Sequence, residues 1–361
     1  MMKKGKKRLW IILLAISLFA IAGVSFLNQP RFGKLPSGKR LERIQKSPNY
    51  KNGEFQNELP TIRIAGNKNF FTSMYEFFFK TYPNTTPDPQ AIKVVKTDLK
   101  KLDPDQNLLV WFGHSSYLLQ VNGKRILVDP VFYKASPVSL VNKAFPGLDV
   151  YKPSDFPQID YLIISHDHWD HLDYQTVTEL KDKVGKVICG LGVGEDFEYW
   201  GYDKNKIIEL NWGENAEIGN GFKIFCLPAR HFSGRGLRPN KTVWASYLIQ
   251  TPTDKIYIGG DSGYDPHFKK VGEQFPGISL AVLENGQYNK NWPQIHTMPE
   301  FLEMEARELG AKEILTVHHS KYKLSTHPWD EPLKNEQKLR RDSLNVLAPT
   351  IGKPILWKTA N

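Results

Sequence analysis

The sequence contains few cysteines and only one long hydrophobic run. Cysteine occurs twice in 361 residues, which is too few for a disulfide framework or a four-cysteine zinc site. Cys189 and Cys226 both lie inside predicted buried strands, where a free thiol behaves as a small hydrophobe. The composition, 40% hydrophobic and 24% charged, is that of a globular protein and excludes collagenous, coiled-coil and wholly disordered chains.

Most of the chain has no excess of charge of either sign. The formal net charge is +10, but residues 1–48 contain 11 Lys or Arg and one acidic residue, which leaves 37 basic and 37 acidic side chains in residues 49–361. Nucleic-acid binding relies on many positive charges spread over the binding face. We therefore expect no nucleic-acid partner.

The N-terminus accounts for the positive charge. Basic residues within positions 3–8 precede Leu9–Leu27, nineteen residues without a charge. About 20 apolar residues span a bilayer as a helix, whereas signal-peptide apolar regions have about 7–15. We expect residues 1–28 to form an uncleaved single-pass anchor, and a signal cleaved near Ala20-Ile21-Ala22 is the alternative. The leading charges favour an extracytoplasmic catalytic domain, although six basic residues after the span would also suit anionic headgroups.

Residues 29–105 are predicted to form a linker and lead segment. Residues 29–66 are rich in Pro, Gly, Asn and Lys, which is typical of a linker or an extended segment. Residues 70–82 carry an aromatic stripe at helical spacing. This stripe predicts a helix packed on the domain, and the alternative is a helix lying in the lipid interface.

Strand patterns dominate residues 106–361, with helices between them. Asn122-Gly123 predicts a tight hairpin turn, and further apolar runs recur as far as Val317. Helices are predicted at residues 174–183, 195–200 and 298–309, the last starting with a capping box at Thr297. Many strands with intervening helices and no repeat indicate one layered α/β domain.

The stretch His166-Asp167-His168-Trp169-Asp170-His171 follows an apolar strand and contains four potential metal ligands. A loop at a strand end can point His166 and His168 one way and turn Asp170 and His171 toward a neighbouring position. Imidazole and carboxylate groups arranged in this way suit two metal ions side by side. Zinc is the default ion for such ligands, with iron and manganese as alternatives.

Two ions need more ligands than one loop supplies, and three later strand ends carry them. His231, Asp261 and His318 each follow a predicted strand, and the Asp261 carboxylate is well suited to bridging both ions. We expect these side chains and the four loop ligands to meet at one sheet edge.

This order of motifs resembles the metallo-β-lactamase superfamily over about residues 107–325. The resemblance implies an αββα sandwich of two mixed sheets, with helices outside and the metals at one edge. It further implies the following ligands: His166, His168 and His231 for one ion, Asp170, His171 and His318 for the second, and Asp261 as the bridge.

Within the superfamily the chain is more similar to the branch of N-acylphosphatidylethanolamine-hydrolysing phospholipases D. The similarity rests on the stretches Trp111–Ser116, Leu127–Pro130, Pro228–His231 and Gly260–Tyr264, and on the run from Gly286 to Glu300. The chain departs from this branch at His319-Ser320-Lys321, where the branch tends to have Trp-Gly-Thr. The departure concerns the pocket wall and therefore the exact substrate.

The expected function is that of a metal-dependent hydrolase, a phospholipase D-type phosphodiesterase acting on N-acylphosphatidylethanolamine-like lipids. The nucleophile would be a hydroxide that bridges the two metals. Asp170, Asp261 and His296 are the expected catalytic residues, and His296 would contact the phosphate or the leaving group. His114 is expected to orient the site rather than to bind metal.

Two alternatives stay open at this point. One is hydrolysis of a soluble ester or lactone on the same metals, and the other is a redox di-iron or non-catalytic metal scaffold. The number of ligands and the bridging Asp261 argue against a closed structural zinc site, which normally uses four ligands on one ion. His267, His319 and His327 have no predicted role, and the sequence predicts no oligomeric state.

Overall fold

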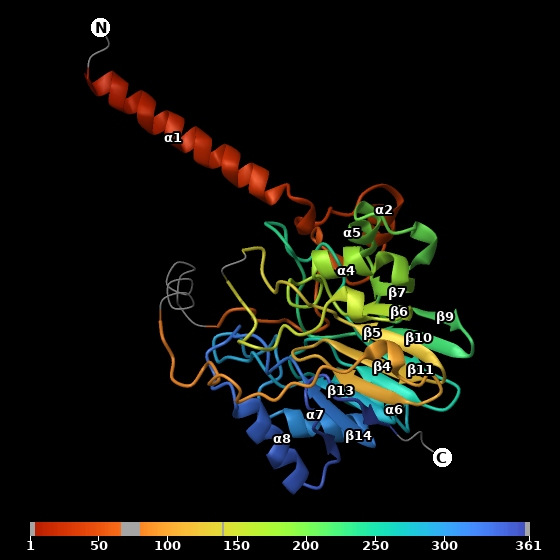
Figure 1. Cartoon of the computed structure of the whole chain (residues 1–361). Helices are drawn as coiled ribbons and strands as arrows, with labels where there is room; N and C mark the ends of the chain where they lie inside the picture. The colour runs from red at the N-terminus through yellow and green to blue at the C-terminus, as the bar shows by residue number, and fades with distance from the viewer. Residues whose placement is uncertain (1–3, 66–79, 139–140, 358–361) are drawn as a thin grey trace.

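Two seven-stranded β-sheets form the centre of the molecule, and one long helix stands clear of them (Figure 1). The computed structural model describes residues 4–65, 80–138 and 141–357. The long helix is α1 (Lys4–Leu27). The predicted aromatic helix falls largely on residues 66–79, which lie outside the described residues.

The first sheet has the strand order β16-β3-β4-β5-β6-β7-β8. Its members are β3 (Leu108–Trp111), β4 (Tyr117–Val121), β5 (Lys124–Val128), β6 (Ile159–Ile164), β7 (Val184–Gly190), β8 (Ile207–Leu210) and β16 (Ile355–Leu356). The pairs from β16 to β5 are antiparallel, and those from β5 to β8 are parallel. The predicted hairpin turn at Asn122-Gly123 joins β4 to β5.

The second sheet has the order β15-β14-β13-β12-β11-β10-β9. Its members are β9 (Asn215–Gly219), β10 (Phe222–Leu227), β11 (Ser246–Gln250), β12 (Lys255–Ile258), β13 (Leu280–Glu284), β14 (Glu313–Val317) and β15 (Val346–Leu347). Strands β9 to β12 pair antiparallel, and β12 to β15 pair parallel. Both sheets are therefore mixed, as expected.

The main core lies between the two sheets. Alternate residues of each strand point to opposite faces, so Leu109 and Ile163 of the first sheet join Ile224 and Ile249 of the second in one buried cluster. The outward residues face helices instead. The first sheet packs against α4 (Tyr174–Leu180) and α5 (Gly194–Tyr199), and the second against α6 (His267–Gln274), α7 (Leu302–Leu309) and α8 (Glu331–Arg341). This arrangement confirms the predicted αββα sandwich.

The helix predicted at residues 298–309 begins later than expected. Helix α7 starts at Leu302, and Phe301 precedes it without a side-chain cap. Thr297 does not form the predicted capping box because its hydroxyl donates to the carbonyl of Ser262 at 2.8 Å. The carboxyl group of Glu305, whose pKa is raised by burial, lies 3.0 Å from the same hydroxyl. Thr297, which was expected to cap the helix, thus fastens this segment to the loop after β12 instead.

The lead segment packs against the body and is not a free linker over its described part. It contains a short 3-10 helix, η1 (Pro30–Phe32), then α2 (Gly38–Gln45), β1 (Tyr50–Lys51) and β2 (Glu54–Phe55). Side chains of α2 make long-range contacts that no local pattern signals. The guanidinium of Arg40 lies 2.5 Å from the carboxylates of Glu195 and Glu198 and 2.7 Å from that of Glu209.

Three of the six basic residues after the span form ion pairs with the body, and contact of this segment with anionic headgroups stays a prediction. Arg40 is held by three carboxylates, Arg43 pairs with Glu214 at 2.5 Å, and Lys34 pairs with Glu195 at 3.4 Å. These pairs neutralise the positive charge nearest the body.

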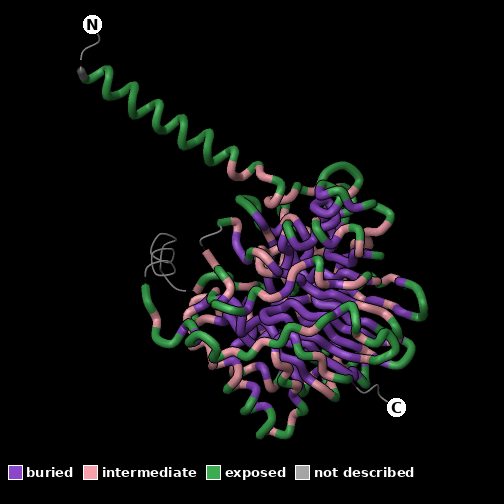
Figure 2. Tube along the Cα trace, in the orientation of Figure 1, coloured by how far each residue is buried: buried purple, intermediate pink, exposed green. Residues whose placement is uncertain are grey.

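Helix α1 stands clear of the body over most of its length, and at its base Phe26 and Leu27 are half-buried (Figure 2). The most apolar 18-residue window within Gly5–Leu27 has a mean hydropathy of 2.5 and is exposed throughout. This segment could be a membrane anchor or a signal sequence. The division of the chain at residues 28 and 105 stays a prediction.

Candidate metal centre

Four strand ends bring the predicted ligands to one edge of the sandwich. The loop that contains His166 and His171 follows β6, and His231 follows β10. Asp261 follows β12, and His318 follows β14 directly. The carboxyl ends of β12 and β14 lie at the same edge because both strands run parallel to β13. The rule that polar side chains gather beyond parallel strand ends thus holds here.

Three imidazoles form the first group. Nδ1 of His168 lies 2.8 Å from Nε2 of His166 and 3.1 Å from Nε2 of His231. Their nitrogens are close enough to bind one metal ion together. The Nδ1 atom of His231 is 2.6 Å from the carbonyl oxygen of Ile295, and this contact turns Nε2 toward the group.

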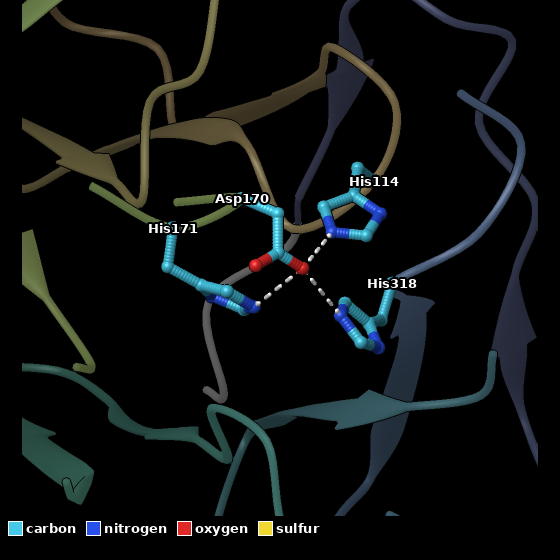
Figure 3. A group of neighbouring side chains, drawn as sticks. All are labelled: His114, Asp170, His171 and His318. Atoms are coloured by element: carbon cyan, nitrogen blue, oxygen red, sulfur yellow. Dashed lines mark hydrogen bonds and ion pairs between the residues drawn. The ribbon is translucent and has the colours of Figure 1, made fainter. Parts of the chain in front are cut away.

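The second group surrounds the carboxylate of Asp170 (Figure 3). Its Oδ2 atom lies 3.0 Å from Nε2 of His114, 3.2 Å from Nε2 of His318 and 3.6 Å from Nε2 of His171. Three imidazoles from three different segments thus point at one carboxylate oxygen. The predicted members Asp170, His171 and His318 are together, and His114 lies beside them.

Asp261 lies between the two groups. Its Oδ2 atom is 3.1 Å from Nε2 of His171 and 3.2 Å from Nε2 of His318, and it is 4.0 Å and 3.8 Å from Nε2 of His166 and His231. One carboxylate therefore reaches imidazoles of both groups. This position is the one predicted for a bridging ligand.

The site has unsatisfied polar atoms that a cation would satisfy. Within the described part of the chain, Oδ1 of Asp261 and Nε2 of His171 are buried and have no hydrogen-bond partner. A buried polar atom without a partner costs about 1–3 kcal/mol. Nitrogen and carboxylate donors that converge in this way fit zinc or a similar divalent ion, so the residues present suit two metal ions.

The protonation of the imidazoles follows from their burial and their neighbours. Burial, together with the nearby rings of His171 and His168, lowers the pKa of His166 well below its usual value. Burial likewise lowers the pKa of His231. A neutral imidazole keeps the lone pair that a metal ion needs.

Asp129 and Ser165 support the second group, and no role was predicted for either. Asp129 Oδ2 is 2.8 Å from Nδ1 of His171, and Asp129 also accepts hydrogen bonds from the backbone N–H of Ser165 at 2.8 Å and from its hydroxyl at 2.6 Å. Asp129 follows β5 directly, so the strand-end signal that identified the ligands also applies to this residue.

His114 is fully buried, and its contact with Asp170 agrees with the predicted orienting role without proving it. Burial and the neighbouring His318 lower the pKa of His114 to about 3, so the ring is neutral. The backbone of His114 has φ 53°, and those of Asp129 and His318 have 40° and 68°. Non-glycine residues rarely adopt this conformation, and such strain gathers at functional sites.

His296 lies at the rim of the centre and contacts Glu284. Its Nδ1 atom is 2.6 Å from Oε1 of Glu284 and 3.9 Å from Oδ2 of Asp261. Its side chain is 13% exposed, whereas those of Asp261 and Glu284 are nearly inaccessible. Glu284 was not predicted, although it is a charged residue at the end of the buried strand β13.

The three histidines without a predicted role are not members of the groups found among the described residues. His267 contacts Asp265 at 2.5 Å, and His319 lies 3.2 Å from the hydroxyl of Thr316. His327 accepts a hydrogen bond from the backbone N–H of Gln287. These contacts give each ring a structural partner.

Comparisons with known proteins agree with this geometry. A model of the β-lactamase superfamily domain matches residues 124–319. An uncharacterized protein of Mycobacterium tuberculosis is 32% identical over 295 residues, covering 80% of this chain and 79% of that protein. The N-acyl-phosphatidylethanolamine-hydrolyzing phospholipase D 1 of Caenorhabditis elegans is 29% identical over 274 residues, covering 70% of this chain and 75% of that enzyme.

The fold also has a solved counterpart. A metallo hydrolase from the archaeon Ignicoccus hospitalis superposes with a TM-score of 0.53 at 21% identity, covering 71% of this chain and all of that one. An identity this low shows the fold alone. Taken with the family match and the convergence of His and Asp side chains, it confirms the predicted resemblance. The chain belongs to the metallo-β-lactamase superfamily and is a metal-dependent hydrolase of that type.

Proposed function

We propose that this protein is a membrane-anchored phosphodiesterase that hydrolyses N-acylphosphatidylethanolamine-like lipids on the headgroup side of the phosphate. The observation that carries the hydrolytic part is the position of Asp261, whose Oδ2 lies within 4.0 Å of imidazoles from both groups. The similarity to the Caenorhabditis elegans enzyme supports the choice of lipid.

The ligand assignment is the one implied by the resemblance, with zinc as the metal. His166, His168 and His231 would hold one ion, Asp170, His171 and His318 the other, and Asp261 both. When bound, two such ions lower the pKa of a shared water and stabilise negative charge on the phosphate oxygens. Asp129 fixes the ring of His171, and the carbonyl of Ile295 fixes that of His231.

We propose that His296 acts on the leaving group. Glu284 accepts a hydrogen bond from Nδ1 of His296, which leaves Nε2 as the nitrogen available to substrate. A protonated His296 would donate its Nε2 proton to the oxygen that departs with the headgroup. Asp261 lies 3.9 Å from the same ring, so this proton donor is close to the centre of the site.

A lipid substrate is also supported by the surface next to His231. The side chain of Asn57 makes two hydrogen bonds to the backbone of His231. Its Nδ2 donates to the carbonyl of His231 at 2.8 Å, and its Oδ1 accepts from the N–H of His231 at 3.1 Å. The chain beyond Asn57 carries Leu59, Ile62 and Ile64, which are 42%, 54% and 57% exposed. A 410 Å³ pocket next to this segment is lined by His231, Leu59 and Trp244 together with polar and charged side chains. The exposed apolar side chains near this pocket would contact an acyl chain.

We further propose that α1 stays attached and holds the body on the extracytoplasmic side of a membrane. Its nineteen uncharged residues, Leu9–Leu27, are long enough to span a bilayer. Protease treatment of intact and of permeabilised cells tests this orientation. Cleavage of the body only after permeabilisation would contradict it.

Turnover of four substrates by the full chain tests the proposed activity. The panel is an N-acylphosphatidylethanolamine and a phosphatidylcholine in mixed micelles, a soluble nitrophenyl phosphodiester, and a lactone. We expect phosphatidic acid and an N-acylethanolamine from the first lipid, and loss of this activity in Asp261→Asn. Turnover of the lactone without hydrolysis of any phosphodiester would contradict the proposal and favour the lactonase alternative.

A further inference from the structure

A cavity of 380 Å³ lies where the chain leaves α1 and meets the body. Arg31 lines it from the segment after α1, and Lys134 lines it from the loop after β5. Trp169 and Tyr174 supply aromatic walls. None of the predicted metal ligands lines this cavity, so it is separate from the candidate metal centre.

The base of α1 is fastened to the body at this cavity. The indole N–H of Trp200 donates to the carbonyl of Pro30 at 2.8 Å, and the guanidinium of Arg235 donates to the carbonyl of Arg31 at 2.8 Å. Phe32 packs edge to face on Trp169 at 5.0 Å. The position of the cavity relative to α1 is therefore fixed by contacts of the backbone and of buried rings.

This position places the cavity at the level of lipid headgroups if α1 spans a bilayer. The apolar segment ends at Leu27, and Arg31 follows four residues later. Residues just beyond the end of a membrane-spanning helix lie in the interfacial region, where Trp and basic residues are favoured. The cavity thus faces the phosphate layer of the membrane that holds the protein.

The charges of the cavity suit an anion. Lys34, Arg40 and Arg43 are paired with carboxylates of the body. The guanidinium of Arg31 instead donates to the neutral side chain of Gln29, and its Nε is buried without a hydrogen-bond partner among the described residues. Asp173 also lines the cavity, but its Oδ2 already accepts hydrogen bonds from Tyr133 N–H at 3.0 Å and Thr176 Oγ1 at 2.5 Å.

We propose that this cavity binds the phosphate-bearing headgroup of an anionic membrane lipid. Its volume is within the range of small-molecule sites, about 300–1,000 Å³, and guanidinium and ammonium groups are the side chains that recognise phosphate. The inference rests on the proposed anchoring by α1 but not on the proposed activity. It concerns a second lipid that is not hydrolysed, whichever substrate the metal centre takes.

A headgroup bound in the cavity would contact Trp169, which belongs to the loop that carries four of the predicted metal ligands. This residue stands between His168 and Asp170 in the chain, and the guanidinium of Arg235 stacks on its ring at 4.1 Å. The same guanidinium donates to the carbonyls of Asp167 at 2.9 Å and Leu172 at 2.6 Å. A headgroup against Trp169 therefore stabilises the loop that carries four predicted ligands.

Retention of lipid by the full chain tests the proposal. The protein is reconstituted in phosphatidylcholine nanodiscs with increasing phosphatidylglycerol, and bound phosphatidylglycerol is counted by native mass spectrometry. We expect one retained molecule, and about tenfold weaker binding in Arg31→Gln/Lys134→Gln. The control Lys39→Gln/Lys46→Gln removes the same charge from the lead segment outside the cavity and should bind like the unmodified chain.

Three results would overturn the proposal. Equal binding by both double variants would show that the cavity is not the site, and equal weakening would show attraction by net charge alone. Displacement of the lipid by inorganic phosphate at equal concentration would show a free-anion site. Should the cavity variant unfold, Ser136→Leu narrows the cavity without changing charge, and undiminished lipid retention in that variant would also contradict the proposal.

Discussion

Asp129 accepts a hydrogen bond from Nδ1 of His171 at 2.8 Å, and this contact determines which nitrogen of the ring faces Asp261. With Nδ1 held by Asp129, Nε2 is the nitrogen that lies 3.1 Å from Oδ2 of Asp261. A carboxylate behind an imidazole both orients the ring and raises its basicity toward a metal. Asp129 is thus part of the working site without being one of the predicted ligands.

Replacing Asp129 should weaken metal binding without removing a ligand. We expect Asp129→Asn to lower metal affinity about 10–100-fold, because the amide no longer fixes the ring of His171. Competition with a chelator measures this affinity. Asp160→Asn is the matched control, since Asp160 lies in the same sheet and pairs with Lys124 at 2.8 Å away from the centre. Equal loss in both variants would contradict the role of Asp129.

The role of His296 predicts a dependence on the leaving group. We expect His296→Gln to lose about 10²–10⁴-fold in hydrolysis of the lipid, whose alkoxide leaving group needs a proton. A nitrophenyl phosphodiester has an acidic leaving group, so its hydrolysis should fall far less. Comparing kcat for the two substrates in His296→Gln and in Glu284→Gln checks this. The same loss for both substrates would indicate a merely structural contact.

Arg40 should stabilise the whole protein through its three carboxylate partners. Its side chain is 14% exposed and that of Arg43 is 44% exposed, although both lie on α2. We expect Arg40→Gln to lower the free energy of unfolding by about 3 kcal/mol, since the nearly buried carboxylate of Glu209 loses its guanidinium partner and that of Glu195 keeps only the exposed Lys34. Arg43→Gln should cost less than about 1 kcal/mol. Denaturant unfolding in detergent measures both, and a similar cost for each would contradict this account.

The lowered pKa of Lys321 should make its contribution to the free energy of unfolding more favourable in alkaline solution. Its ammonium group is buried and donates to the carbonyl of Val131 at 2.8 Å, and burial lowers its pKa to about 8 from the usual 10.5. Between these values the unfolded chain binds a proton that the folded chain does not, so stability rises with pH. We expect the unfolding free energy, taken relative to Lys321→Met, to rise by up to about 3 kcal/mol from pH 8 to 10.5. If the difference in unfolding free energy between the two chains does not change with pH, the lowered pKa of Lys321 is contradicted.

The sequence allowed the strand ends of the site to be predicted because the rule involved is local. An apolar run followed by His or Asp marks a ligand position, and parallel pairing of β12, β13 and β14 brings such positions to one edge. The confirmed sandwich depends on the same alternation of apolar residues. The predicted ligands themselves now need a measurement with metal.

Other parts of the site could not be predicted because they depend on partners distant in the chain. Glu284 and Asp129 stand at strand ends as the predicted ligands do, but their contacts become visible only when the fold brings His296 and His171 to them. Helix α2 has a polar sequence, and its position is set by Arg40 meeting carboxylates more than 150 residues away. Thr297 matched a helix-capping pattern, but a hydrogen bond to Ser262 determines its conformation.

The metal content of purified variants tests the central claim most directly. Elemental analysis of the full chain should find two metal ions in the unmodified protein and about one in either His231→Ala or His318→Ala. The doubly substituted chain should bind none tightly, and Asp261→Asn should lose metal from both positions. A single ion in the unmodified protein, or two ions retained by both single variants, would contradict a pair of cations shared by Asp261.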